Sequence, residues 1–431
     1  MFNTNIRLLT SSKLSRPNSW YINSISAILL IICYGATSTL VIPNVNPDTS
    51  GTSHDVGPRY VNMVALLVLG LALFGQTLLA IWCYYNNLRD IPSWSANPLN
   101  TTVTMLNQQL VQHREGRCMS PFQVPDTSDG SPSLPRTRQP SQWQASSSVR
   151  RVNIFIWILV GVSYMWFLAI VLVTRSNVRT NMEDYHTSNQ PSALGPTWFF
   201  TWDWSPVVPS SAQTPYFNAV YFTLDPNEGS QESMSFPAAL VVGLVFVCAI
   251  QGLQTLALHC AELIVNTSRD EDVWRALDAQ DGSNSKSHAL TTPPFLAALL
   301  SWKYDMLQIF KSLLHWLLGQ SLQPSFAAPG AAFFTMLYSR VFVYCICATV
   351  FAFAIAFLAF VEPKGPQPAT YGHIQTIADV IDDWTLDKNG WFWWGDKGAR
   401  GGVRHAGMSS RKEDLGPIEM SALYAGELAG T

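Results

Sequence analysis

Apolar residues stand in long uninterrupted runs along this chain. The clearest run covers residues 341–361 and contains no charged side chain. A helix needs roughly 20 residues, at about 1.5 Å each, to cross about 30 Å of hydrocarbon. Similar runs lie at residues 21–42, 61–85, 153–174 and 237–261. The pattern therefore predicts a polytopic helical membrane protein.

A sixth stretch, residues 304–322, is less apolar because it contains Asp305, Lys311 and His315. If it also crosses, the chain has about six transmembrane helices and both termini lie in the cytosol. On this topology 21 Lys and Arg residues lie on the cytosolic side and 4 on the outer side, with Lys311 in the membrane. Cytosolic segments of membrane proteins carry an excess of these residues. The sequence thus predicts an all-α fold with about six spans.

The predicted segments alternate between the two sides of the membrane. Their order is a cytosolic N-terminus at 1–20, transmembrane helices 1 and 2 within 21–85, a cytosolic loop at 86–151, transmembrane helix 3 at 152–174, an outer loop at 175–236, transmembrane helices 4 to 6 within 237–361, a cytosolic juxtamembrane segment at 362–398 and a tail at 399–431.

The loops differ in composition. The cytosolic loop turns to Ser, Pro, Gln, Thr and Arg from about residue 119. Such a segment buries too little apolar surface to order itself, so we expect disorder there and in the tail 399–431. The outer loop 175–236 is aromatic, and the alternation around Val220 and Phe222 resembles a strand. It is either a cap whose rings rest among lipid headgroups or a platform for a ligand.

The segment 362–398 is predicted to form a cytosolic amphipathic helix and an aromatic hairpin. Its isoleucines recur at helical spacing, and Asn389-Gly390 is a hairpin-type turn beside four aromatic residues. So many aromatic side chains must be covered by the membrane, a loop or a partner. We therefore expect a cytosolic protein partner to bind through Ile374, Ile377, Ile381, Trp384, Trp391, Trp393 and Trp394.

Composition narrows the function class. Charged residues make up only 13% of the chain and the apolar residues come in blocks, which excludes disorder or an ordinary soluble domain for the runs. The sequence contains no HExxH, GxSxG or P-loop pattern, and its histidines are scattered. We expect no cofactor, no metal site, no catalytic residues and no nucleic-acid partner. The expected partner is the lipid bilayer.

Candidate chemistry lies on the sixth stretch. Its polar residues follow one helical face, with Lys311 beside it. A lysine near the middle of the bilayer costs about 2.5–3.5 kcal/mol on insertion scales, so it needs a partner from another span. The fourth run supplies polar residues at its cytosolic half. The predicted substrate-binding set is Asp305, Gln308, Lys311, Ser312, His315, Gln251, His259 and Glu262.

Three interpretations of this set remain open. The polar residues could line a cavity that binds a solute or relays protons between spans 4 and 5. They could instead form hydrogen bonds between helices, each contributing about 1 kcal/mol or less. In the third interpretation, the stretch 304–322 lies in the membrane interface and does not cross.

Four segments together resemble a group of fungal polytopic membrane proteins. They are PSWSANPLNTT at 92–102, LQTLALHCAELIVNTSRDEDVWR at 253–275, LLHWLLGQSL at 313–322 and the stretch 366–398, which begins with PQPATYGH and ends with WWGDKG. The resemblance covers the membrane core and the juxtamembrane segment. It implies a multi-span fold and favours 304–322 as a span, and it carries over no catalytic or binding residues.

Three function classes follow from these observations. The first is a structural, scaffolding or regulatory role in the membrane, which acts through the cytosolic loop and the aromatic segment. The second is a transporter or channel that uses the polar face of 304–322. The third class is an integral-membrane enzyme. It ranks last because no enzyme motif supports it.

Overall fold

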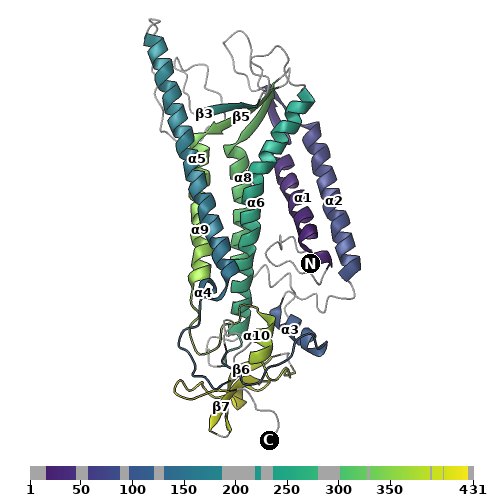
Figure 1. The fold of residues 1–431 in the computed structure, drawn as a ribbon, viewed down its shortest axis with the longest axis vertical. Coiled ribbons are helices and arrows are strands. Elements are labelled where there is room, and N and C mark those ends of the chain that lie inside the picture. The colour runs from purple at the N-terminus through teal and green to yellow at the C-terminus, as the bar shows by residue number, and fades with distance from the viewer. Residues whose placement is uncertain are drawn as a thin grey trace.

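The computed structural model describes residues 16–44, 57–87, 97–120, 131–186, 219–224, 236–279, 301–327, 331–388, 391–400 and 402–425. The molecule is an elongated helical bundle with short strands at one end and a small domain of helices and strands at the other (Figure 1). We call the latter the membrane-distal domain. The fold is mostly helical, as predicted.

Five helices in the described residues are long and apolar enough to cross a membrane. Each coincides with an apolar run of the sequence, which confirms the prediction of membrane helices at this level. They are α1 (Trp20–Ser38), α2 (Met63–Asn87), α5 (Ser147–His186), α6 (Phe236–Arg275) and α9 (Tyr338–Phe360).

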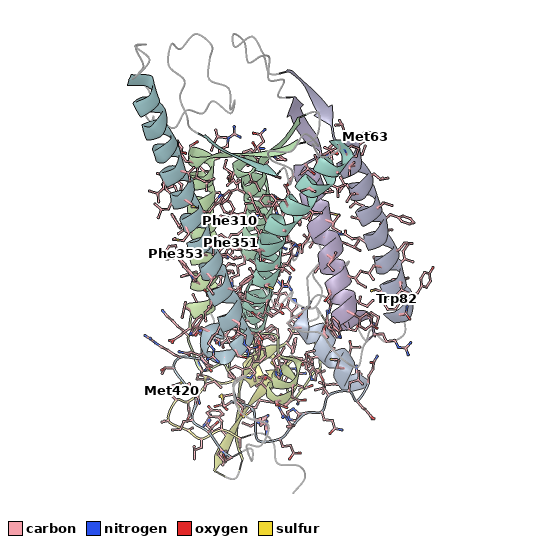
Figure 2. The ribbon with its side chains drawn as sticks, turned by 45° about the horizontal axis from the view of Figure 1, so that its top comes forward. Met63, Trp82, Phe310, Phe351, Phe353 and Met420 are labelled. Atoms are coloured by element: carbon pink, nitrogen blue, oxygen red, sulfur yellow. The ribbon has the colours of Figure 1, made fainter. Side chains whose placement is uncertain are left out.

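Large apolar side chains cover the outer surface of the bundle. Leu67, Phe74 and Phe353 are each at least 60% exposed. Figure 2 shows Phe353 on the outside of α9, whereas Phe310 and Phe351 meet inside the bundle at a ring distance of 5.4 Å. An exposed apolar belt of this extent is typical of a surface that faces lipid.

Helix α8 (Trp302–Ser321) covers the sixth stretch and packs beside α6 and α9 (Figure 1). At its start, Lys303 donates a hydrogen bond to Ser268 of α6 at 2.8 Å. At its end, Gly319 lies against Ser38, the last residue of α1. Helix α8 therefore runs antiparallel to α6, and its twenty residues correspond to about 30 Å.

Short strands close the end of the bundle that α8 reaches. Strands β1 (Val41–Asn44) and β2 (Gly57–Val61) pair with each other. Strands β3 (Ala219–Leu224), β5 (Ala331–Leu337) and β4 (Gln323–Ala327) form an antiparallel sheet in that order. Strand β3 confirms the predicted strand around Val220, and most of the remaining outer loop lies outside the described residues.

The membrane-distal domain contains α3 (Pro98–Asn107), α10 (Ile374–Val380), β6 (Trp393–Arg400), β7 (Val403–Ser409) and the end of α6. Trp274, Ile377, Trp394 and Tyr424 are fully buried in its core. The short helix α4 (Gln142–Ala145) lies where the bundle meets this domain. The domain therefore has a hydrophobic core of its own.

The described parts of two segments that we predicted to be disordered are ordered in this domain. In the loop that we predicted to be cytosolic, Ser133 pairs with Tyr424, and Gln139 is buried. In the tail, residues 403–409 form β7, which pairs with β6. Ser133 pairs with backbone that is distant in the sequence, whereas β7 pairs with the strand just before it, and the composition of these segments reports neither contact.

The predicted amphipathic helix and hairpin also differ from the structure. Helix α10 has seven residues and ends at Val380, so Ile381 and Trp384 lie beyond it. The hairpin joins β6 to β7 after the aromatic residues, with Gly402 in its turn at a φ of +85°. The predicted turn at 389–390 lies outside the described residues. A hairpin turn that the sequence did not predict follows the aromatic strand, because the tail 403–409 supplies the partner of β6.

Candidate functional site

Helices α6 and α8 meet along a row of polar side chains inside the bundle. On α6 these residues follow helical spacing from Gln251 through Thr255 and His259 to Glu262, so they share one face. On α8 the residues Lys311 and His315 are four apart and face α6. All six side chains are buried.

An ion pair lies at one end of this row. Lys311 pairs with the carboxylate of Glu262, and the two side chains are 7% and 6% exposed. The Nδ1 atom of His259 lies 3.4 Å from Oε1 of Glu262 and 3.5 Å from Nζ of Lys311. The imidazole therefore contacts both charges of a pair that is buried among helices.

The other end of the row reaches α1. The Nδ1 atom of His315 lies 2.9 Å from Oε1 of Gln251, whose Nε2 donates to the Ser38 hydroxyl at 3.1 Å. The ring of Tyr34 stacks on His315 with centroids 3.6 Å apart. We call the set Ser38, Gln251, His315, His259, Lys311 and Glu262 the polar column.

Several buried atoms in and beside the polar column have no hydrogen-bond partner among the described residues. They are Nε2 of His259, Nε2 of His315, Oε2 of Glu262 and both amide atoms of Gln254. A buried polar atom without a partner costs roughly 1–3 kcal/mol. These atoms can bind water, a proton or a small polar solute.

The structure brings five of the eight predicted site residues together: Gln251, His259, Glu262, Lys311 and His315. Asp305 is half-buried, nearly two turns from Lys311 on the same helix. Gln308 and the exposed Ser312 line a shallow depression on the outside of α8 with Trp316. Each residue advances about 100° around a helix, so Ser312 turns away from the face that Lys311 occupies.

Sequence reasoning missed Tyr34 and Ser38 of α1. Both lie next to Gly35 and Ala36, which are buried where α1 contacts α6. A carbon at the Cβ position of Gly35 would overlap the sulfur of Cys248. This small-residue pair is the signal in the sequence that marks the face of α1 next to the site.

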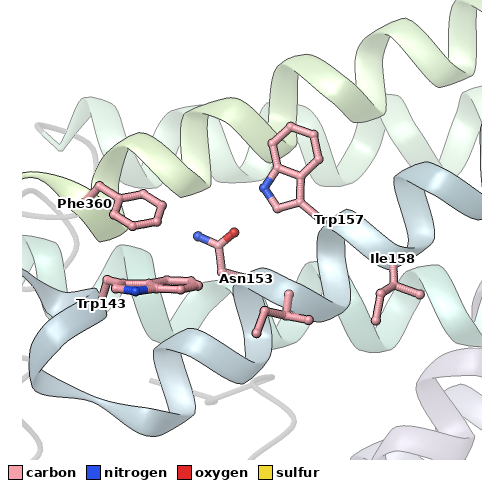
Figure 3. A pocket seen from close by; sticks show the side chains of 6 residues that line it. Trp143, Asn153, Trp157, Ile158 and Phe360 are labelled. Atoms are coloured by element: carbon pink, nitrogen blue, oxygen red, sulfur yellow. The ribbon is translucent and has the colours of Figure 1, made fainter.

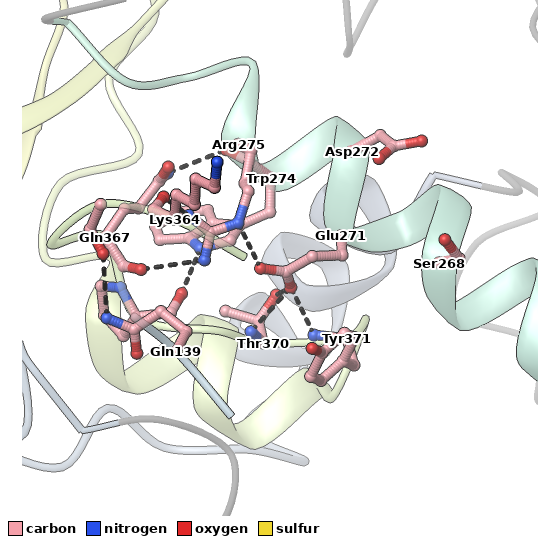
Figure 4. Close-up of polar contacts among 12 residues, drawn as sticks. Gln139, Ser268, Glu271, Asp272, Trp274, Arg275, Lys364, Gln367, Thr370 and Tyr371 are labelled. Atoms are coloured by element: carbon pink, nitrogen blue, oxygen red, sulfur yellow. Dashed lines mark hydrogen bonds and ion pairs between the residues drawn. The ribbon is translucent and has the colours of Figure 1, made fainter. Parts of the chain in front are cut away.

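Beyond the polar column, α6 continues into the membrane-distal domain. Figure 4 shows Glu271 accepting hydrogen bonds from the backbone amides of Thr370 and Tyr371, at 2.9 and 2.8 Å, and from Arg275 at 2.9 Å. Trp274 donates to the carbonyl of Pro368 at 2.7 Å. These contacts fix the segment that follows α9 to the end of α6.

The residues that we assigned to a partner contact pack within the chain itself. Ile377, Ile381 and Trp394 are at most 1% exposed, and Trp393 packs against Ala279. The others, Ile374, Trp384 and Trp391, are half-buried. The aromatic segment is therefore covered largely by its own domain.

Function has to be argued from this geometry. No protein-family model, curated protein or solved structure matches the chain.

Proposed function

We propose that this protein carries protons across the membrane, as a transporter or channel, through the polar column between α1, α6 and α8. One observation carries the proposal. A buried ion pair stands beside two imidazoles, and each imidazole has a ring nitrogen without a partner among the described residues. Ionisable residues inside membrane spans are expensive, and they mark proton relays and ion pathways.

The chemistry of the column suits protons. An imidazole accepts a proton on one nitrogen and releases one from the other. His259 lies beside the carboxylate of Glu262, which accepts protons, and beside the ammonium of Lys311, which donates them. Residues 251 to 262 of α6 extend over about 16 Å, roughly half the thickness of the hydrocarbon.

Structural packing is the competing explanation. Hydrogen bonds between helices stabilise a bundle when every polar atom of the network has a partner. In the polar column and its neighbour Gln254, five buried atoms have none among the described residues. This arrangement favours a site that exchanges protons or water over a closed structural network.

A proton pathway requires α8 to lie within the bilayer. We propose that α8 is the sixth span and that both termini are cytosolic, supported by its antiparallel packing on α6 and by the bias of Lys and Arg. A protease-accessible tag after Thr431 is then expected on the cytosolic side of intact membranes. A tag protected on the lumenal or outer side contradicts this topology.

The scaffolding hypothesis loses its main support. It relied on aromatic residues that bind a partner, and most of these side chains are covered by the membrane-distal domain. The resemblance to fungal membrane proteins stays a prediction and adds no function.

Proton flux through the purified protein tests the proposal. The protein is reconstituted into vesicles that enclose a pH-sensitive dye, a pH difference is imposed, and valinomycin with K⁺ balances the charge. Glu262→Gln removes the carboxylate of the column at nearly constant volume and is expected to reduce the flux to that of protein-free vesicles. Asp305→Asn, on α8 outside the column, is the matched control and should retain the flux. Equal flux in the Glu262→Gln and wild-type proteins contradicts the proposal.

A further inference from the structure

A second feature lies on the outside of the bundle, where α4, α5 and the end of α9 meet (Figure 3). There a groove of about 390 Å³ is lined by Trp143, Asn153, Ile154, Trp157, Ile158 and Phe360. The rings of Trp143 and Phe360 are 4.7 Å apart. Because Phe360 is the last residue of α9, the groove lies at the boundary between the apolar bundle and the membrane-distal domain.

Among the described residues that line this groove, Asn153 is the only one with an amide side chain. Its side chain is 2% exposed, and Nδ2 has no hydrogen-bond partner among the described residues. Figure 3 shows the amide beside the rings of Trp143, Trp157 and Phe360. A buried amide on an apolar wall indicates a ligand that is largely apolar and carries a hydrogen-bonding oxygen.

Positive charge lies at the rim. Arg150 and Arg151 are exposed, and they stand three residues before Asn153 and Ile154 on α5, so each pair shares a helix face. The carboxylate of Glu362 is nearby, but it pairs with Arg138 at 3.8 Å and accepts a hydrogen bond from Gln144 at 3.3 Å. The two arginines on α5 therefore leave the rim suited to an anion.

We propose that this groove binds one anionic glycerophospholipid from the membrane. Arg150 and Arg151 bind its phosphate and the further negative charge of its headgroup, because guanidinium groups match the geometry of phosphate and carboxylate oxygens. The amide of Asn153 donates to an ester carbonyl. An acyl chain follows Ile154, Trp157 and Ile158 along α5. The order of these groups, from charge to amide to apolar surface, matches the order of groups in the lipid.

Native mass spectrometry of the detergent-purified full chain tests this inference with two added probes, phosphatidylserine and phosphatidylcholine of the same acyl composition. Both lipids carry the phosphate, but only phosphatidylserine adds a carboxylate and a net negative charge. The wild-type protein should therefore retain one phosphatidylserine about tenfold more tightly than phosphatidylcholine, since one additional charge-assisted contact contributes at least that factor. Arg150→Gln/Arg151→Gln should abolish this preference. Asn153→Leu should weaken the binding of both lipids.

Trp82→Ala is the matched control, because Trp82 is a half-exposed tryptophan toward the same end of another helix (Figure 2). It should bind both lipids as the wild type does. The arginine variant changes only exposed side chains, so it tests the inference even if Asn153→Leu fails to fold. Equal retention of the two lipids by the wild type overturns the inference. So does an unchanged preference in the arginine variant.

Discussion

Both side chains of the Lys311–Glu262 pair are buried. The energetics of such a pair show whether it serves the stability of the protein or its function. Removing one member of a buried ion pair costs about 3–5 kcal/mol because the other charge is left without a partner. Replacing both members with apolar residues of similar volume is often neutral or stabilising. If the pair serves proton transfer, as we propose, the bundle is expected to fold without it when apolar residues of similar volume replace both charges.

A second residue pair, Asp382 and His405, affects the stability of the membrane-distal domain. Asp382 accepts hydrogen bonds from His405 and Lys397, both at 2.7 Å. Burial alone would raise the pKa of Asp382, but these hydrogen bonds and that of the Met408 amide bring it well below its ordinary value. Burial alone would lower the pKa of His405, but hydrogen bonds to Asp382 and Cys118 and the charge of Asp382 raise it well above 6.5.

The two pKa shifts predict a pH window for the stability of this domain. The raised pKa of His405 contributes stability that is fully present below about pH 6.5 and is lost as the pH rises toward its folded value. The lowered pKa of Asp382 contributes stability that is present above about pH 4 and is lost as the pH falls toward its folded value. The pair therefore stabilises the domain most between about pH 4 and 6.5.

Asp382→Asn should reduce the free energy of unfolding by about 1.5–3 kcal/mol at pH 6, the usual contribution of a hydrogen bond to a charged group. Protease accessibility of the domain during thermal unfolding measures this difference. It should shrink as the pH rises from about 6.5 to 9. A difference that is constant over this range contradicts the assigned pairing.

At the scale of elements, α1 reaches the polar column because Gly35 permits a close approach to α6. A methyl group there would overlap Cys248, so the two helices would have to separate. Gly35→Ala is expected to destabilise the protein by about 1–3 kcal/mol, the usual cost of overpacking. Thermal unfolding in detergent measures this cost.

Gly161 of α5 provides the control. A methyl group at this position meets nothing within 4 Å. Gly161→Ala should therefore be neutral or stabilise the helix by about 0.5–1 kcal/mol, the difference between glycine and alanine in a helix interior. Equal effects at Gly35 and Gly161 would show that close approach to Cys248 does not set the position of α1.

The apolar runs predicted the spans because a single helix in lipid must be apolar over its whole length, a local property of the sequence. Pairing between distant segments has no such local signal. Strand β5 pairs with the neighbouring strand β4 and also with β3, which lies in another loop far back in the sequence. Strand β7 pairs with β6 but was predicted as part of a disordered tail. The pairing of β3 with β5 forms only when segments far apart in the sequence meet.

The polar column was partly predictable because the charge of Lys311 within an apolar stretch is a local property of the sequence. Lys311 required a buried partner, and Glu262 stood at a matching depth on the neighbouring run, so the pair could be anticipated. The spacing of polar residues on α8 did not show which side faces α6, and Ser312 lies on the outside. The contribution of α1 depends on how three helices pack, which a single-helix pattern does not contain.

At the scale of the whole molecule, α6 joins the two main features of the protein. Its forty residues carry the polar column in the middle and the contacts of Glu271 with the membrane-distal domain at the end (Figures 1 and 4). The same helix therefore fixes the positions of the column and the domain relative to each other. Helix α6 therefore runs without interruption from the membrane bundle into the terminal domain, beside the segment that follows α9.

The most direct test of the central claim is proton flux through a variant that keeps its fold but loses both charges. Lys311→Met/Glu262→Leu replaces the ion pair with apolar residues, so its thermal unfolding should match that of the wild type. In dye-loaded vesicles under an imposed pH difference, the wild type is expected to carry protons and the double variant to carry no more than protein-free vesicles. Wild-type flux in the double variant would contradict the claim, and so would a wild-type protein that carries none.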